Sequence, residues 1–401
     1  MEKLSLIVFV SYQPLTPRFE KDFYTDTLLA KGFQIEFWDL SPLFHNQLIM
    51  HETKQKEFVR YFSAYDVLEE AIRQNHHHAF FIFHINYYAA VYKLFKLFSK
   101  YKCFTGFFAR GMLPFPLLKE SLYTKLLKKM QLLKKRNVLK GLALNQASGW
   151  AKKLNIIQPF DIVFTAGTEG IYSVGYGYKK ELVKAKKINI NAVDYDQFMI
   201  VKESGIRLFN APYCVFLDEY LPHHPDFEIL KIPKLDANAY YDSLNTFFGK
   251  IEQELGIKVI IAAHPTSDYE NYKAYRRRLV LKYKTAELVK DSEFVMAHTS
   301  TSISLAVLFQ KPLLFLYSNE IMKTYAHTRY PHILFFASIL NARAVNINNS
   351  KTIKDLPFHN YDADQYEKYK YKYLTSPESE KSSTKKILIS FLESLKFGTA
   401  H

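Results

Sequence analysis

The alternation of short apolar runs with helix-like stretches is the feature that most constrains the fold of this chain. In the first half, the apolar runs are rich in β-branched and aromatic residues. They are LSLIVFVS, FQIEFWDL, HAFFIFHI, CFTGFF and DIVFTAG, beginning at residues 4, 33, 78, 103 and 161. Strands that alternate with helices in this way predict parallel strands joined by right-handed crossovers. The first half therefore predicts an open α/β sheet.

The same pattern starts again in the second half. Its apolar runs are PYCVFLDEY, KVIIAAHP, FVMAHT and PLLFLYS, beginning at residues 212, 258, 294 and 312. A chain of 401 residues is also too long for one ordinary core. We therefore expect an α/β protein with two Rossmann-like domains facing a central cleft, at residues 1–200 and 201–345. Residues 346–401 form a tail, and the helical spacing of KKILISFLESL predicts a terminal helix that packs back on the body.

Composition narrows the classes of partner and compartment. The formal net charge of +15 predicts an anionic partner, but no recognition-helix, zinc-finger or RNP-type pattern accompanies it, so we do not expect nucleic-acid binding. The two cysteines, Cys103 and Cys214, lie far apart and favour neither a disulfide framework nor a zinc site. No apolar run approaches the roughly 20 residues that span a bilayer, and no cleavage pattern follows the first run. These features predict a cytoplasmic protein.

Candidate functional residues follow the predicted strands, where open α/β folds usually bind ligands. The run KVIIAAHPTSDYE ends its β-like part at His264-Pro265, so a strand would deliver the imidazole to the edge of the cleft. There the ring can donate a hydrogen bond to a phosphate oxygen. Glu270 closes the same segment and is a further candidate for donor binding. A histidine tucked under a turn is the structural alternative.

A second candidate is the segment FVMAHTSTSISLAVLF, which passes from a strand into an apolar helix. Five polar residues mark the passage: His298, Thr299, Ser300, Thr301 and Ser302. Their hydroxyls can cap the helix, and the free N–H groups and positive dipole end of a helix attract phosphate. Simple capping is the alternative, and the two roles are compatible.

The third candidate is the acid pair in CVFLDEYLPHHPD. Asp218 and Glu219 follow a buried-type strand, and adjacent residues on an extended segment point in opposite directions. At most one of the two carboxylates therefore faces the cleft, where it could take a proton from an acceptor hydroxyl. A turn-capping aspartate or a salt-bridged pair would explain the same residues without catalysis.

Taken in order, the acid pair, the HP motif and the Ser/Thr cluster resemble the bacterial sialyltransferases and the related Kdo and polysialic acid transferases. The resemblance covers residues 212–318. It implies a GT-B fold and a CMP-activated acidic sugar, transferred to a surface glycan by a metal-independent inverting reaction without a cofactor. By similarity, Asp218 would be the general base, and His264 and Ser300–Ser302 would hold the CMP phosphate.

This chain also departs from the pattern. Several of those families have glycine after the acid pair, whereas Tyr220 stands here, so the choice between Asp218 and Glu219 as base stays open. The layout also looks like that of the CDP-glycerol glycerophosphotransferases. A UDP- or GDP-sugar enzyme and a non-catalytic scaffold for an anionic polymer are further alternatives.

Two weaker features complete the prediction. Gly167, in AGTEG after a predicted strand, could allow backbone contact with a ligand, although an ordinary βα turn needs the same glycine. Residues 117–140 carry leucines along one helical stripe with lysines mostly off it. Such a helix could lie peripherally on an anionic membrane face, or it could pack its leucines into the first domain.

Overall fold

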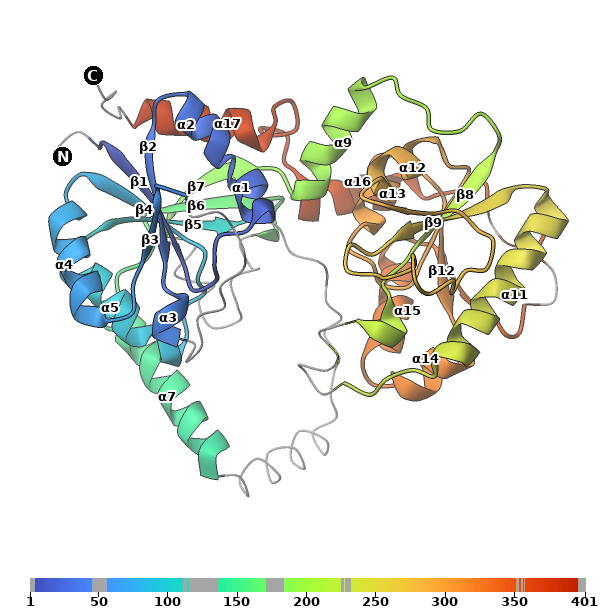
Figure 1. Ribbon diagram of the computed structural model, residues 1–401, viewed down its shortest axis with the longest axis horizontal. Helices are drawn as coiled ribbons and strands as arrows, with labels where there is room; N and C mark the ends of the chain where they lie inside the picture. The colour runs from blue at the N-terminus through green and yellow to red at the C-terminus, as the bar shows by residue number, and fades with distance from the viewer. Residues whose placement is uncertain are drawn as a thin grey trace. The chain divides into compact units, whose positions relative to one another are not determined.

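The structure is a computed structural model, and it divides into two compact units (Figure 1). It describes residues 4–44, 56–110, 114, 136–170, 184–224, 227, 232–350, 353, 354, 356 and 358–395. Of these, the first unit takes the residues up to Asn191 except Pro114, and those from Thr375 onward. The second unit takes Pro114 and Ala192–Leu374.

The first unit is built on a parallel sheet of seven strands in the order β3-β2-β1-β4-β5-β6-β7. The strands are β1 (Leu6–Ser11), β2 (Gln34–Asp39), β3 (Val59–Tyr61), β4 (Ala79–Phe83), β5 (Phe104–Ala109), β6 (Ile162–Ala166) and β7 (Lys186–Ile190). The helices are α1 (Pro17–Phe23), α2 (Thr25–Ala30), α3 (Ser41–Phe44), α4 (Tyr65–Asn75), η1 (Ala89–Val91), α5 (Tyr92–Lys100), α7 (Arg136–Lys153) and α17 (Thr384–Ser394).

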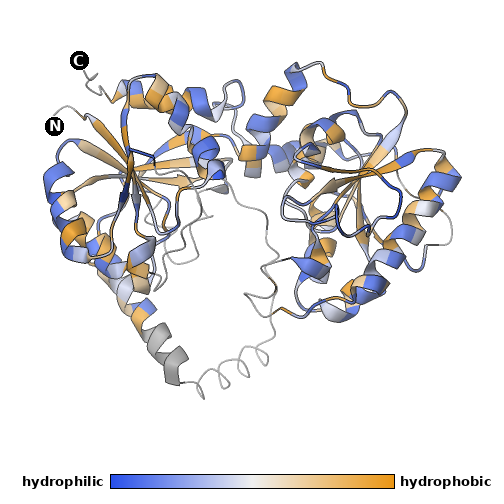
Figure 2. Ribbon diagram, in the orientation of Figure 1, coloured by the Kyte–Doolittle hydropathy of each residue, from blue (hydrophilic) through white to orange (hydrophobic). Residues whose placement is uncertain are grey.

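Helices cover both faces of the first sheet. The central strands are buried on both sides, which is why β4 reads as an uninterrupted apolar run, AFFIF. One core lies under α4 and α5, and the other lies under α1, α2 and α17. Figure 2 shows that the central strands of both units are mainly hydrophobic.

The second unit contains a parallel sheet of six strands in the order β10-β9-β8-β11-β12-β13. The strands are β8 (Tyr213–Leu217), β9 (Lys258–Ala263), β10 (Val280–Lys282), β11 (Val295–Ala297), β12 (Leu313–Tyr317) and β13 (Arg343–Asn346). The helices are α9 (Val193–Glu203), η3 (Leu221–His223), α11 (Ala237–Leu255), α12 (Thr285–Asp291), α13 (Ile303–Leu308), α14 (Asn319–Thr324), α15 (Arg329–Ile339), α16 (Ala363–Tyr369) and η4 (Lys370–Leu374).

Both sheets confirm the predicted α/β class with two Rossmann-like sheets. In each, the first strand of the unit lies inside the sheet, the second and third strands lie to one side of it, and the later strands lie to the other. The chain thus reverses its direction of travel beside β1 in the first sheet and beside β8 in the second. The central cleft between the units stays a prediction.

The ends of the units differ from the predicted domain bounds of 200/201 and 345/346. Residue 200 lies within α9, which is the first helix of the second unit. The tail is divided, because α16 belongs to the second unit and α17 to the first. Leu388 and Leu392 of α17 are fully buried in the first unit.

Two of the places where the chain passes from one unit to the other, after Asn191 and after Leu374, are tied by local hydrogen bonds. The side chain of Asn191 accepts a hydrogen bond from the Thr375 hydroxyl at 2.7 Å, and the Ala192 amide donates to the Leu374 carbonyl at 2.8 Å. Within the described residues, no helix is long and apolar enough to cross a membrane.

Candidate functional site

The candidate site lies at the carboxyl edge of the second sheet, where β8 and β11 run side by side. The chain leaves β8 toward β9 on one side and returns to β11 on the other, which makes this pair the topological switch point of the sheet. Ala297 of β11 pairs with Leu217 of β8, so the polar residues that follow each strand emerge next to one another. Open α/β sheets bind ligands at such points.

Glu219, Thr299 and Arg329 form one hydrogen-bonded group here, which we call the Glu219 network. The Thr299 hydroxyl donates to the Glu219 carboxylate at 3.0 Å, and the Thr299 backbone N–H donates to its other oxygen. Arg329 forms a salt bridge with the same carboxylate and donates to the Thr299 hydroxyl oxygen at 3.1 Å. The network thereby joins the ends of two neighbouring strands to the first residue of α15.

In the Glu219 network, the negative charge of Glu219 is paired with the positive charge of Arg329. Burial alone would raise the pKa of Glu219, but the Arg329 guanidinium and the Thr299 donors outweigh it, and the pKa lies below its ordinary value. Both contacts of Arg329 use Nη1, and its side chain keeps 27% of its surface exposed. The Arg329 guanidinium also lies over the Phe227 ring, at 5.0 Å from its centroid. A rigidly held, partly open guanidinium suits an anionic ligand.

Asp218 points into the interior of the unit. Its carboxylate accepts hydrogen bonds from the Tyr275 hydroxyl at 2.7 Å, the Tyr269 hydroxyl at 2.8 Å and the Tyr220 backbone N–H at 3.1 Å. Burial raises its pKa, and these donors together with the His264 backbone act in the opposite direction. Because donors occupy both oxygens, this position does not fit the predicted role of Asp218 as a general base that meets a substrate hydroxyl.

His298 is also an interior residue. Its Nδ1 lies 2.6 Å from the Leu316 carbonyl, which can only accept, so Nδ1 carries the proton. Its Nε2 then accepts from the Tyr240 hydroxyl at 3.0 Å. Burial lowers the pKa of His298, which agrees with a neutral ring. The predicted contact of His298 with the nucleotide does not fit this geometry, because both ring nitrogens are engaged inside the core.

His264 lies at the end of β9 and remains half-exposed. Its Nδ1 accepts from the Thr266 backbone N–H at 3.3 Å, which leaves the proton of the neutral ring on Nε2. The His264 carbonyl accepts from the Ser267 backbone N–H and hydroxyl at 3.0 and 2.7 Å, which closes the turn around Pro265. The ring lies 5.0 Å from that of His224. The strand delivers the imidazole to the sheet edge, as the sequence predicts.

The hydroxyl cluster forms a tight turn before α13. The Ser300 hydroxyl accepts from the Ser302 backbone N–H at 3.3 Å, and the Ser302 side chain makes no capping bond to the helix. Thr301 is exposed. Since neighbouring strands lie about 4.8 Å apart and β8 separates β9 from β11, His264 and this turn start from strand ends roughly 10 Å apart. Their shared grip on one phosphate stays a prediction.

The remaining candidates are scattered. Glu270 lies exposed on the segment between β9 and β10. Gly167 belongs to the first unit, where it follows β6 with a φ of 63°, so the turn itself requires glycine. The helix predicted over 117–140 lies outside the described residues, apart from the α7 backbone from Arg136 onward.

Sequence reasoning missed Arg329 and the tyrosines that hold Asp218. Arg329 follows no strand, and the segment YAHTRYPH around it carries no motif that separates a site arginine from a surface arginine. Tyr269 and Tyr275 lie in a polar loop, SDYENYKAYRRR, where tyrosine usually indicates a half-exposed ring. Their meeting with Asp218 depends on the path of that loop, which local patterns do not contain.

Comparison with known proteins identifies no family for the chain. No protein-family model and no curated protein matches the chain. Among solved structures, the UDP-GlcNAc 2-epimerase of Methanocaldococcus jannaschii is similar at a TM-score of 0.47 and 10% identity, covering 97% of this chain and 99% of that chain. The UDP-GlcNAc 2-epimerase of Neisseria meningitidis bound to UDP-GlcNAc gives 0.47 and 12%, with coverage of 97% and 99%.

A third similar structure is the glycotransferase of kitacinnamycin, with a TM-score of 0.46, 10% identity and coverage of 98% of this chain and 99% of that chain. At these values the likeness concerns the course of the chain alone. What the site can do therefore has to be argued from its own residues.

Proposed function

We propose that the chain is a GT-B-type transferase that binds a nucleotide-activated sugar at the carboxyl edge of its second sheet. The observation that carries the proposal is the Glu219 network at the switch point, with His264 at the end of the adjacent strand β9. This edge gathers a fixed guanidinium, an imidazole N–H and several hydroxyls. Such donors suit the phosphate groups of a nucleotide.

The chemistry of glycosyl transfer explains why these groups would be needed. As the bond to the sugar breaks, negative charge accumulates on the phosphate of the departing nucleotide. Arg329 and the Nε2–H of His264 are donors that can stabilise this charge, a contribution that is often the largest in such sites. Glu219 would keep the guanidinium in place, so that little reorganisation is needed during the reaction.

We further propose a CMP-activated acidic sugar as the donor and a surface glycan as the acceptor, in an inverting, metal-independent reaction. The order of the acid pair, the HP turn and the hydroxyl turn supports this choice, and the net charge of +15 suits an acidic sugar and an anionic acceptor. A CDP-glycerol-type glycerophosphotransferase or a UDP- or GDP-sugar enzyme would use the same edge.

We assign positioning roles to the two acids that follow β8. Asp218 would hold the loop of Tyr269 and Tyr275 beside the site, since its oxygens are occupied by their hydroxyls. Glu219 would orient Arg329, and its lowered pKa makes it a weak base. The predicted choice between these two residues as the base is thereby replaced by two structural tasks.

A thermal-shift panel of CMP, CDP, UDP and GDP tests the proposal, because a ligand that binds only the folded state raises its melting temperature. We expect the largest shift with CMP. A larger shift with UDP or GDP would replace the CMP-sugar donor, and no shift with any of the four would remove the nucleotide site. A phosphodiester in the product, instead of a glycosidic bond, would favour the glycerophosphotransferase.

A matched pair of variants locates the site. Arg329→Lys keeps a positive charge beside Glu219 but loses the forked geometry, so we expect nucleotide affinity to fall about tenfold or more. Thr301→Ser removes only a methyl group from the exposed turn and should leave the affinity within about twofold. Equal affinity in Arg329→Lys and the wild type would exclude Arg329 from the phosphate site.

A further inference from the structure

A pocket of about 600 Å³ lies at the opposite, amino edge of the second sheet. It borders the first residues of two strands, Tyr213 of β8 and Lys258 of β9, and Leu279, which precedes β10. Since β9 has six residues and a strand rises about 3.3 Å per residue, this pocket is roughly 20 Å from the Glu219 network. We call it the amino-edge pocket, and the proposed donor site does not include it.

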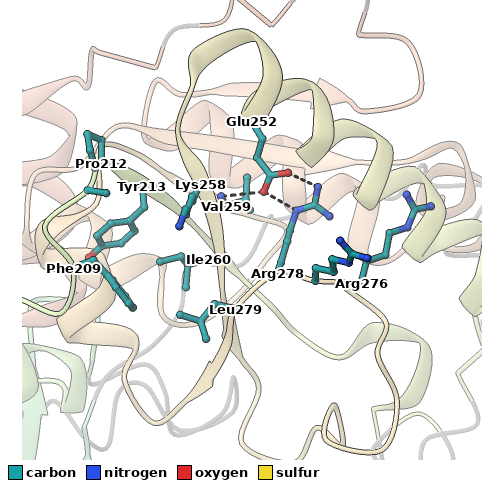
Figure 3. Close-up of a pocket in the computed structure, with 12 residues that line it drawn as sticks. Phe209, Pro212, Tyr213, Glu252, Lys258, Val259, Ile260, Arg276, Arg278 and Leu279 are labelled. Carbon is teal, nitrogen blue, oxygen red and sulfur yellow. Dashed lines mark hydrogen bonds and ion pairs between the residues drawn. The ribbon is translucent and has the colours of Figure 1, made fainter.

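The amino-edge pocket has an apolar side and a cationic side. Figure 3 shows Phe209, Ile260 and Leu279 together on one side, with Arg276 and Arg278 on the other. The Phe209 ring packs edge-on against Tyr213, and Leu279 keeps 44% of its surface exposed. Both sides are therefore open to one ligand of mixed character.

The cations of the pocket differ in how firmly they are held. Arg278 is fixed, because it donates to the Glu252 carboxylate at 3.0 and 2.7 Å and to the Asn245 side chain at 2.7 Å. Glu252 also accepts from the Val259 backbone N–H at 3.3 Å. Its carboxylate is therefore already neutralised by Arg278 and hydrogen-bonded within the unit. Glu252 is the acid among the lining residues, so the lining offers no carboxylate to the other three cations, Arg276, Arg277 and Lys258.

Three cations of the lining remain for a ligand: Arg276, Arg277 and Lys258. All three are exposed. Among the described residues, Arg276 forms a salt bridge with Asp242 at 3.3 Å, which is weak because both side chains lie largely in water. Arg276 also has a φ of 58°, a left-handed conformation that is unfavourable for arginine. Such backbone strain is often found where a side chain has a functional task.

The other side chains of the lining offer almost no hydrogen bonds to a ligand. Its aliphatic side chains are those of Ala211, Pro212, Val259, Ile260 and Leu279. The Tyr213 hydroxyl is already donated to the Leu288 carbonyl at 2.8 Å. A nucleobase or a sugar would leave its polar groups unpaired here, whereas a hydrocarbon chain would lose nothing.

We propose that the amino-edge pocket binds an amphiphilic phosphate monoester. Arg276, Arg277 and Lys258 take the phosphate, and the apolar side from Phe209 to Leu279 takes the hydrocarbon chain. The volume lies within the usual range for ligand pockets, about 300 to 1,000 Å³. The site gives the second unit a means of holding a lipid phosphate at the face opposite its donor edge.

Calorimetry on the full chain with farnesyl phosphate, inorganic phosphate, farnesol and CMP tests this site. Farnesyl phosphate should bind at least about tenfold more tightly than inorganic phosphate or farnesol, because only it engages both sides. CMP should not compete with it. Equal affinity for farnesyl phosphate and inorganic phosphate, or displacement by CMP, would overturn the proposal.

Variants locate the binding on the chain. Arg276→Ala with Arg277→Ala should weaken farnesyl phosphate about tenfold or more, and Leu279→Asn should weaken it several-fold. Lys273→Ala removes an exposed cation from the same loop outside the lining and should change the affinity by less than about twofold. Circular dichroism checks that each variant folds. Unchanged binding in the double variant contradicts the proposal.

A second arm presents the ligand in a bilayer. Phosphatidylcholine vesicles that contain farnesyl phosphate should sediment with the wild type and with Lys273→Ala, but not with the double variant. Sedimentation independent of Arg276 and Arg277, together with no binding of the monomeric ligand, would also overturn the site. Neither arm uses a nucleotide sugar, so the outcome does not depend on the proposed transferase activity.

Discussion

The two sheets have the same strand order around their switch points but carry different side chains there. In the first unit, His84 follows β4 and lies against the rings of Phe19 and Phe23, at 5.4 and 5.5 Å. In the second unit, the corresponding strand β11 is followed by His298, which accepts from the Tyr240 hydroxyl, and by Thr299, which belongs to the Glu219 network. The same topology thus supports an aromatic edge in one unit and a charge-handling edge in the other.

An arginine lies at each of these edges, and the two show the difference most directly. Arg329 is held by Glu219 and Thr299 within the second unit. Arg110 follows β5 and makes one long contact with Asp22, at 3.7 Å, while its guanidinium lies over three aromatic rings. Among the described residues, its Nε and Nη2 are buried without a hydrogen-bond partner. Arg329 completes the Glu219 network, whereas Arg110 mainly packs against aromatic rings.

The largest expected effect separates these two arginines. Arg329→Ala leaves the Glu219 carboxylate buried without its counter-charge and should lower the free energy of unfolding by about 3 to 5 kcal/mol. Arg110→Ala loses packing but also removes two unpaired donors, so its cost should be about 1 kcal/mol or less. Urea denaturation followed by circular dichroism measures both variants. Equal costs would break the comparison.

The positions of the tryptophans allow each unit to be followed separately. Both of them, Trp38 and Trp150, lie in the first unit, so tryptophan fluorescence follows its unfolding. We expect Arg329→Ala to shift the circular dichroism transition while the fluorescence transition changes less. A shift confined to fluorescence would contradict the assignment of Arg329 to the second unit's stability.

The next effect concerns Asp218 and the tyrosine hydroxyls that donate to it in the second unit. Tyr275→Phe removes one hydroxyl donor from this buried carboxylate and should cost about 1 to 3 kcal/mol. Tyr272→Phe makes the same change on an exposed ring of the same loop and should cost less than about 0.5 kcal/mol. Thermal unfolding of the two variants measures the difference. Equal melting temperatures would mean that the Tyr275 hydroxyl does not hold Asp218, and would again favour Asp218 as the general base.

A smaller effect depends on pH. The pKa of Glu219 lies below its ordinary value of 4.5, so its ionised form stabilises the fold above that pH, and this contribution is lost as the pH falls through the lowered pKa. Glu219→Gln should therefore melt below the wild type at pH 7, with a gap that narrows under about pH 4.5. A gap that widens on acidification would contradict the sign. Melting curves at several pH values decide this.

The smallest effect is expected in the hydroxyl turn. Thr301 is exposed, so Thr301→Ala should change the free energy of unfolding by less than about 0.5 kcal/mol. Ser300→Ala removes the acceptor of the Ser302 N–H and should cost about 0.5 to 1.5 kcal/mol. Chemical denaturation compares them. A larger cost for Thr301→Ala would mean that the turn is held differently.

The strands found from the sequence and those that were missed differ in one physical property. All nine predicted strands are present, and each lies inside its sheet. A strand that is buried on both faces needs apolar residues throughout, so its sequence is an apolar run. The four missed strands, β3, β7, β10 and β13, are the edges of the two sheets. They have three to five residues and include segments such as VRY and KKINI, because one flank of an edge strand meets solvent.

The sequence predicted where the candidate residues lie, but only partly what each of them does. Strand-end polarity located Asp218, Glu219, His264 and His298 at one sheet edge, since the direction of parallel strands determines it. Whether a side chain then faces outward or inward depends on its partners. His298 and Asp218 turn inward because tyrosines from distant loops meet them, and no local pattern encodes such long-range meetings.

The return of α17 to the first unit has a consequence for how the protein is made. Residues Ala192–Leu374 of the second unit lie between β7 and α17 in the sequence, so the ribosome synthesises them before α17, which completes the first unit. Until then, Phe80 and Phe164 on the sheet lack their contacts with Phe391 of α17. The first unit is therefore the first to begin synthesis but the last to be completed.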